Sequence, residues 1–118
     1  LDEIIAAADG IMIARGDLGH AIPMETLPFV KKDILKRCNA ASKPAIVATE
    51  MLTSMIDDTD PSRADISDIA HAVLDGASAT MLSNDTAVGG YPVETVRVMR
   101  TVVDEATKHR LTEVTTHF

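Results

Sequence analysis

The sequence contains 118 residues, of which 46% are hydrophobic and 25% are charged, a composition typical of a folded globular domain. Its formal net charge of −7, with only 11 Lys and Arg residues, argues against nucleic-acid binding, which depends on clustered basic side chains. The single cysteine excludes an internal disulfide and suits a reducing compartment such as the cytoplasm. No apolar run reaches the roughly 20 residues that a membrane-spanning helix needs, so no membrane partner is expected.

Three short apolar runs begin at residues 11, 45 and 79, which are 34 residues apart. Each run follows a turn signal: Asp9-Gly10, Ser42-Lys43-Pro44 and Asp75-Gly76. Short continuous apolar runs between turns are typical of strands that are buried on both faces of a parallel sheet. We therefore expect adjacent parallel strands near residues 11–15, 45–49 and 79–82. Helical repeats of 34 residues also exist, but they lack apolar tetrapeptides bounded by Gly or Pro.

The segments between the strands have a helical period. After Pro28, one apolar stripe contains Val30, Ile34, Leu35 and Cys38, so we expect Cys38 to be buried and unreactive. The next stripe contains Ile66, Ile69, Ala70, Val73 and Leu74. Its start is marked by Asp60 as a cap, Pro61 in the first turn, and residues 62–65 as a capping box.

A third helix is predicted to begin at Pro92 and to turn Val93, Val96, Met99 and Val103 inward. Residues 110–118 show no clear period, so we expect one domain over residues 1–109 and a frayed tail over 110–118. The chain therefore consists of three βα units. A (β/α)₈ barrel uses about 31 residues per unit, whereas a doubly wound open sheet is the alternative, and three units do not separate the two.

Polar residues follow each predicted strand: residues 15–17 (RGD), residues 49–50 (TE) and residues 83–86 (SNDT). In both parallel architectures the ligand site lies at the carboxyl ends of the strands. Asp17 is a hard oxygen donor of the kind that Mg²⁺ takes, and Gly16 lets backbone N–H groups approach an anion. The alternatives are a capped turn at Asp17, a hydroxyl that closes the strand at Thr49, and a plain loop at residues 83–86. An adhesion role for the Arg-Gly-Asp tripeptide is disfavoured, because the tripeptide is fused to a buried strand.

The motifs as a set resemble pyruvate kinase in order and spacing, from residue 1 to about residue 107. They are residues 1–5 (LDEII), 9–19 (DGIMIARGDLG), 22–23 (IP), 43–44 (KP), 48–49 (AT), 51–52 (ML), 54–56 (SMI), 63–64 (RA), 67–68 (SD), 72–77 (AVLDGA), 81–83 (MLS) and 91–94 (YPVE). The resemblance implies an α/β fold that is part of a (β/α)₈ TIM barrel, three parallel βα units corresponding to strands six to eight.

The resemblance also implies the activity, which is phosphoryl transfer from phosphoenolpyruvate to ADP, giving pyruvate and ATP in glycolysis. It assigns Asp17 to Mg²⁺ or Mn²⁺, and Gly16, Asp17 and Thr49 to the substrate carboxylate. It assigns Ser83 to the catalytic water network near the enol carbon. K⁺ is a further cofactor whose ligands lie outside these 118 residues, and the family implies a cytoplasmic homo-oligomer.

The chain departs from the family at several positions. The family usually has Ser-Gly-Glu-Thr where this chain has Ser83-Asn84-Asp85-Thr86, and it commonly has Gln at the position of Glu50. The family's catalytic lysine, second metal acid, lid and ADP site lie outside the 118 residues. We therefore expect the isolated chain to be inactive. The alternative is a non-catalytic remnant that self-associates and binds an anion or a protein partner.

Overall fold

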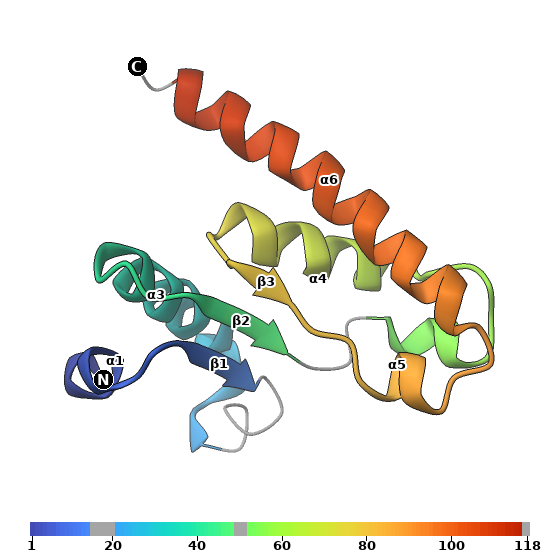
Figure 1. Ribbon diagram of the computed structural model, residues 1–118, viewed down its shortest axis with the longest axis horizontal. Helices are drawn as coiled ribbons and strands as arrows, with labels where there is room; N and C mark the ends of the chain where they lie inside the picture. The colour runs from blue at the N-terminus through green and yellow to red at the C-terminus, as the bar shows by residue number, and fades with distance from the viewer. Residues whose placement is uncertain (15–20, 49–51, 117–118) are drawn as a thin grey trace. The chain divides into compact units, whose positions relative to one another are not determined.

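The computed structural model describes residues 1–14, 21–48 and 52–116, with the backbone alone for residues 112–116 (Figure 1). The chain divides into two compact units, Leu1–Thr49 with Asp75–Met81, and Glu50–Leu74 with Leu82–Phe118. The first unit contains α1 (Asp2–Ala7), β1 (Ile11–Ala14), the 3₁₀ turn η1 (Met24–Thr26), α3 (Leu27–Ala40), β2 (Ala45–Ala48) and β3 (Ala79–Thr80). The second unit contains the 3₁₀ turn η2 (Thr53–Ile56), α4 (Arg63–Leu74), α5 (Asn84–Ala87) and α6 (Pro92–Thr116).

The three strands of the first unit form a parallel sheet in the order β1-β2-β3. In its register, Met12 pairs with Ile46, and Ile46 pairs with Ala79. This arrangement confirms the prediction of three adjacent parallel strands. β3 is shorter than the predicted run, although the Met81 N–H still donates to the Val47 carbonyl at 3.0 Å.

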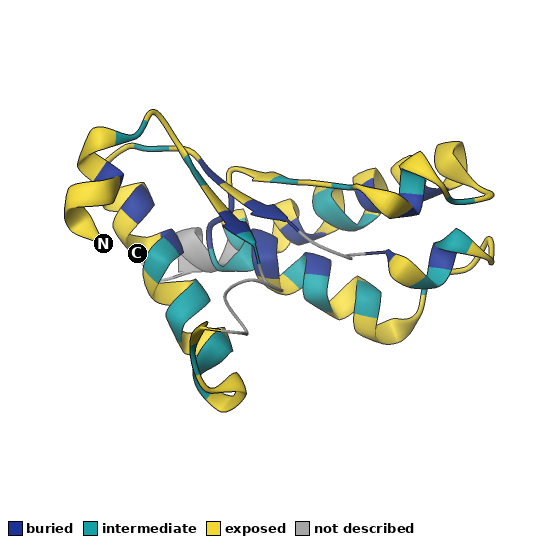
Figure 2. Cartoon of the chain, turned by 90° about the horizontal axis from the view of Figure 1, so that it is seen from below, coloured by how far each residue is buried: buried dark blue, intermediate teal, exposed yellow. Residues whose placement is uncertain are grey.

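Burial varies from residue to residue along the strands, as the colours of Figure 2 mark along the chain. Ile13 and Val47 are buried on one face, and α3, which contributes the fully buried Leu35 and Cys38, packs against β2. The predicted burial of Cys38 is therefore confirmed. Met12 and Ile46 lie on the opposite face and are 55% and 37% exposed. The face that carries Ile13 and Val47 is thus covered, whereas the opposite face is exposed at Met12 and Ile46 and buried at Ala48.

Two turns hold the strands of the first unit in place. After α3, the Lys43 N–H donates to the Cys38 carbonyl and the Ser42 N–H donates to the Asn39 carbonyl, the two bonds of a Schellman motif. Ser42 occupies its left-handed position with φ of 57°. Before β3, Gly76 has φ of +107°, and its carbonyl accepts a hydrogen bond from the Asn39 side chain at 3.1 Å. The Asp75-Gly76 turn signal therefore marks a backbone shape that favours glycine.

In the second unit, α4 and α6 pack side by side (Figure 1). Ile69, Val73, Met99 and Ala106 are buried, and so are Leu52 and Met55 at the turn η2. Near the end of α4, the Arg110 guanidinium donates to the Val73 carbonyl at 3.4 Å. The core of this unit therefore forms between two helices and the turn segment before them.

Several helical predictions are wrong in detail. Val93 and Val96 were expected inward but are 57% and 51% exposed, while Thr95 is fully buried. Ile66, expected on the buried stripe of α4, is 38% exposed. The face of a long helix that is buried depends on the element that packs against it, and valines near one end of α6 do not reveal that element.

The predicted caps and boundaries also change. α4 begins at Arg63, and the Ser62 hydroxyl accepts the Asp65 N–H at 3.1 Å, so Ser62 rather than Asp60 is the cap. α6 runs from Pro92 to Thr116, and the division into a domain over residues 1–109 and a tail over 110–118 stays a prediction.

Candidate functional site

The carboxyl ends of the three strands lie at the same edge of the sheet. Ala14 at the end of β1 pairs with Ala48 at the end of β2, and Thr80 at the end of β3 pairs with Val47. This edge is the position at which a parallel sheet carries its ligand site.

Only some of the predicted site residues belong to the part of the chain that the structure describes. Gly16, Asp17 and Thr49 follow β1 and β2 directly in the chain and lie outside the described residues. Ser83 is described, and it is the residue immediately before α5. Its side chain is exposed and does not cap the helix. The structure therefore locates one of the four predicted residues.

The backbone of Ser83 is held on both sides. Its carbonyl accepts the Ala87 N–H at 2.8 Å and the Thr86 N–H at 3.0 Å, as the first turn of α5 requires. Its N–H donates to the Asp85 carboxylate oxygen Oδ1 at 2.7 Å. The backbone of Ser83 is therefore fixed by hydrogen bonds, while the residue itself is exposed.

Asp85 is the polar residue of this region that sequence reasoning missed. Its side chain is 2% exposed. Besides the bond from Ser83, its second oxygen Oδ2 accepts the Leu52 N–H at 3.2 Å. The available sequence signal is the position of Asp85, two residues after Ser83, which precedes the short helix α5. An acid in the first turn of a helix can reach back and accept the free N–H group of the residue before the helix.

Asn84 is the position at which the resemblance leads us to expect glycine. It is the first residue of α5, and among the described residues that are not glycine only Ser42 has a positive φ. The side chain of Asn84 therefore causes no backbone conflict at this position.

A second polar network lies in the same unit, at the start of α4. The Ser54 N–H and hydroxyl both donate to the Asp65 carboxylate oxygen Oδ2, and the Ser62 N–H donates to the Ser54 hydroxyl at 2.9 Å. Because every partner belongs to the turn η2 or to the cap of α4, this network explains how the helix begins.

Among the described residues, the titrating groups whose pKa is clearly shifted lie on α3. Hydrogen bonds to Asp2 and Asp33 raise the pKa of the exposed Arg37 guanidinium, and burial raises the pKa of the Cys38 thiol. Neither residue follows a strand, so neither shift indicates a catalytic group.

A metal site must be judged from donor chemistry. In the part of the chain that the structure describes, no three His, Cys, Asp or Glu side chains gather closely enough to share an ion. Both oxygens of Asp85 already accept backbone N–H groups. Mg²⁺ is commonly held by one or two carboxylates together with substrate and water, so the single acid Asp17 after β1 has suitable chemistry.

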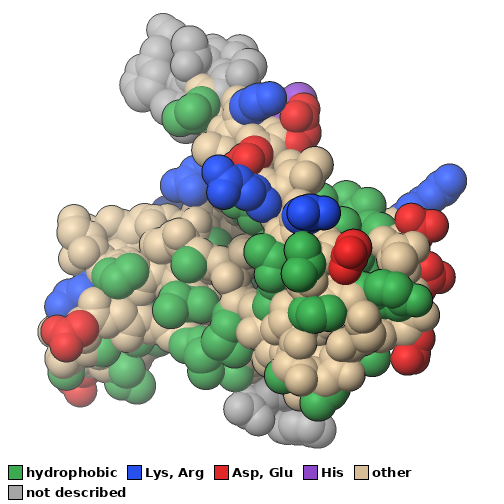
Figure 3. Space-filling view, turned by 45° about the vertical axis from the view of Figure 1, so that its right-hand side comes forward, with side chains coloured by type: hydrophobic (Ala, Val, Ile, Leu, Met, Phe, Trp, Pro, Cys, Tyr) green, Lys and Arg blue, Asp and Glu red, His purple; other side chains and the backbone are tan. Residues whose placement is uncertain are grey.

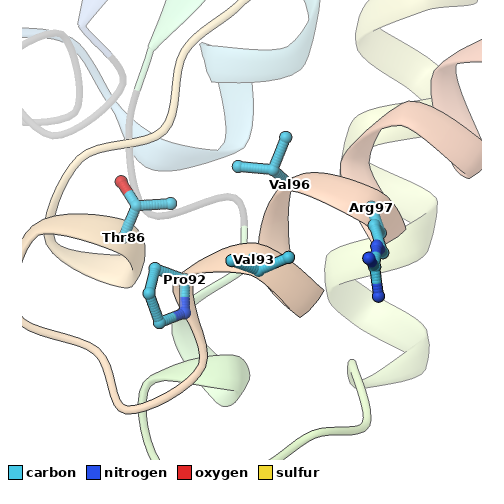
Figure 4. Close-up of a pocket in the computed structure, with 5 residues that line it drawn as sticks. All are labelled: Thr86, Pro92, Val93, Val96 and Arg97. Atoms are coloured by element: carbon cyan, nitrogen blue, oxygen red, sulfur yellow. The ribbon is translucent and has the colours of Figure 1, made fainter.

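An open pocket of about 400 Å³ lies between α5 and the start of α6 (Figure 4). Its lining consists of Thr86, Pro92, Val93, Val96 and Arg97. Hydrophobic side chains also reach the surface elsewhere among the charged ones (Figure 3). The pocket contains no acid and none of the predicted site residues, so it is not the candidate site.

Among the described helices, none is long and apolar enough to cross a membrane.

Comparison with known proteins gives one consistent family. The profile of the pyruvate kinase barrel domain matches residues 1–96. The chain is 51% identical over 109 residues to pyruvate kinase from Thermococcus litoralis, covering 92% of this chain and 23% of that protein. It is 56% identical over 102 residues to the chloroplastic pyruvate kinase isozyme G of Ricinus communis, covering 86% of this chain and 24% of that protein.

A solved structure agrees with these sequence matches. The crystal structure of a pyruvate kinase from Cryptosporidium parvum superimposes with a TM-score of 0.86 at 48% identity, covering 89% of this chain and 21% of that one. The chain thus spans about a quarter of the length of the curated relatives named above.

Proposed function

Because this chain belongs to the pyruvate kinase family of phosphotransferases, we propose that it supplies the last three βα units of a barrel that transfers a phosphoryl group from phosphoenolpyruvate to ADP. The observation that carries the proposal is the joint match in fold and sequence, a TM-score of 0.86 at 48% identity. The residues that follow the three strands are polar in the way that this chemistry requires.

The proposed roles divide among these residues. The backbone N–H groups of Gly16 and Asp17 and the hydroxyl of Thr49 bind the substrate carboxylate, and fixed donors of this kind orient a substrate for transfer. Ser83 takes part in protonation of the enol carbon through water. Mg²⁺ or Mn²⁺ held by Asp17 would neutralise negative charge on the phosphoryl oxygens, and the ligands for K⁺ lie outside the 118 residues.

We further propose that the protein acts in the cytoplasm as a homo-oligomer. The buried Cys38 agrees with a reducing compartment. Because the proposed lysine, lid and nucleotide site lie outside this segment, the 118 residues alone should show no turnover in a coupled assay.

The test is a chimera in which residues 1–109 replace the matching stretch of the Thermococcus litoralis enzyme. We expect the chimera to form pyruvate from phosphoenolpyruvate and ADP. Asp17→Asn should lower kcat/KM at least about 100-fold, because a charged group at the transferring phosphoryl is lost, while the exposed Asp104→Asn should change it little. A folded chimera without turnover would overturn the proposal.

A second candidate function is a self-associating protein without catalysis. The open sheet face at Met12 and Ile46 favours it. The same chimera separates the two functions, since a self-associating segment would fold there without restoring turnover.

A further inference from the structure

One buried carboxylate joins the two segments that follow β2 and β3. Leu52 comes four residues after the end of β2, and Ser83 comes three residues after the end of β3. The Asp85 side chain accepts the backbone N–H of both residues, at 3.2 Å from Leu52 and 2.7 Å from Ser83. Segments that are 31 residues apart in sequence (83 − 52) are thereby tied to one anion.

The burial of this carboxylate is unusual without a cation. Asp85 is 2% exposed, and no Lys or Arg of the described residues forms an ion pair with it. Burying a charged group is costly unless hydrogen bonds compensate it, and hydrogen bonds from N–H groups to a carboxylate are among the strong ones. The two amides therefore account for the buried charge, and Asp85 in turn fixes both amides.

The contact has different consequences for the two amides. Leu52 is fully buried and its carbonyl accepts the Met55 N–H at 2.9 Å, so packing also restrains it. Ser83 is exposed as a residue, and the bond to Asp85 is the hydrogen bond that the structure shows for its N–H. Asp85 is therefore the main restraint on the amino side of Ser83, whose hydroxyl stands one residue before α5.

We propose that Asp85 is a positioning residue, which sets the backbone of Ser83 and of the segment at Leu52 for catalysis through its two amide hydrogen bonds. The proposal rests on the proposed function, because it gives Asp85 a role through Ser83. It does not require Asp85 to touch the substrate. A displacement of about 1 Å in a positioned group costs up to about 100-fold in rate, so loss of this restraint should appear in the kinetics.

The test compares Asp85→Asn with a matched control, Asp65→Asn, in the chimera described above. Asp65 is also a carboxylate of the second unit that accepts two hydrogen bonds, but both come from Ser54. Hydrogen–deuterium exchange is measured on peptides that cover residues 81–84 and 52–56. Asp85→Asn should speed exchange in the 81–84 peptide at least about tenfold, and Asp65→Asn should leave that peptide unchanged.

The kinetic readout is kcat and KM for each substrate. We expect Asp85→Asn to lower kcat/KM for phosphoenolpyruvate about 10- to 100-fold, with KM for ADP unchanged. Asp65→Asn should lower the melting temperature without changing either constant. Equal kinetic losses in the two variants would mean that Asp85 acts through general stability, and would overturn the proposal.

The two proposals fail in different ways. If the unmutated chimera has no turnover, the proposed function fails, and the exchange experiment then decides the Asp85 contact alone. If Asp85→Asn does not fold, hydrogen–deuterium exchange of the unmutated protein tests the proposal. Its 81–84 peptide should retain a slowly exchanging amide, and free exchange of that peptide would contradict the hydrogen bond on which the role depends.

Discussion

Ser42 occupies the left-handed position of the Schellman motif after α3, with φ of 57°. A residue with a Cβ in this conformation costs about 1 kcal/mol or more relative to glycine. We therefore expect Ser42→Gly to raise the free energy of unfolding by about 1 kcal/mol, measured by urea denaturation. Ser42→Ala keeps the Cβ and should give no such gain. A gain of the same size in both variants would show that backbone conformation is not the cause.

Cys38 is fully buried, and burial raises the pKa of its thiol above the ordinary value of 9.0. A raised pKa in the folded state means that the native protein holds the proton more tightly than the unfolded chain does. The contribution to stability is therefore complete below pH of about 9 and is lost as pH rises through the folded pKa.

This linkage can be measured against Cys38→Ala, which has no thiol to titrate. The difference in unfolding free energy between the wild type and this variant should shrink above pH of about 9. The native thiol should also resist a thiol reagent until denaturant is added. Rapid modification of the native protein would contradict the burial of Cys38.

At the scale of elements, the start of α4 depends on one hydroxyl. Ser62 accepts the Asp65 N–H and holds the N-cap position, whereas Asp60 lies outside the helix. Replacing a serine cap with alanine costs about 1 kcal/mol, so Ser62→Ala should lower the unfolding free energy by that amount in thermal or urea denaturation. Asp60→Ala is the control and should change stability by less than about 0.5 kcal/mol. A larger effect at Asp60 would restore it as the cap.

The sheet as an element determines where the site can be. β1 and β2 end at the paired residues Ala14 and Ala48, so whatever follows them leaves from one edge. Within the second unit, the backbone of Ser83 is held by the short helix α5 and by the carboxylate of Asp85. Strand register therefore fixes the strand ends of the first unit, and one buried carboxylate holds the Ser83 N–H in the second unit.

At the scale of the whole molecule, the open face of the sheet is the main liability. Met12 and Ile46 are paired in register and lie 55% and 37% exposed, and Met81 is 37% exposed. β1 and β3 are the outer strands of this three-stranded sheet, and outer strands readily pair with other chains. Burial of apolar surface stabilises by about 25 cal/mol per Å². The net charge of −7 opposes association, but salt screens it within about 10 Å at 0.1 M.

We therefore expect the 118-residue chain alone to sediment as a dimer or larger assembly at micromolar concentration in moderate salt. Met12→Lys with Ile46→Lys should make it monomeric by placing charge on the open face. The control is Ile4→Lys with Met24→Lys, which adds the same charge at exposed positions away from that face. A well-folded wild-type monomer would refute the prediction.

Part of the candidate site could be predicted from the sequence. The positions of the predicted strands indicated that polar residues gather at the carboxyl edge of the sheet. The resemblance assigned roles in the site to Gly16, Asp17, Thr49 and Ser83. The first three lie outside the described residues, so their roles stay predictions. The sequence predicts only a loop at Asp85, because its hydrogen bond to an amide 33 residues earlier in the chain leaves no local pattern.

The sequence by itself determined the strands, their parallel arrangement and the burial of Cys38, because short apolar runs between turns and helical apolar stripes are local patterns. Only the tertiary structure decided that α6 buries Thr95 and exposes Val93 and Val96, since packing against α4 selects the face. It also decided the burial of Asp85 between two distant amides. The difference is physical: the type of each element follows from the local period of its apolar residues, whereas side-chain burial depends on contacts between residues far apart in the chain.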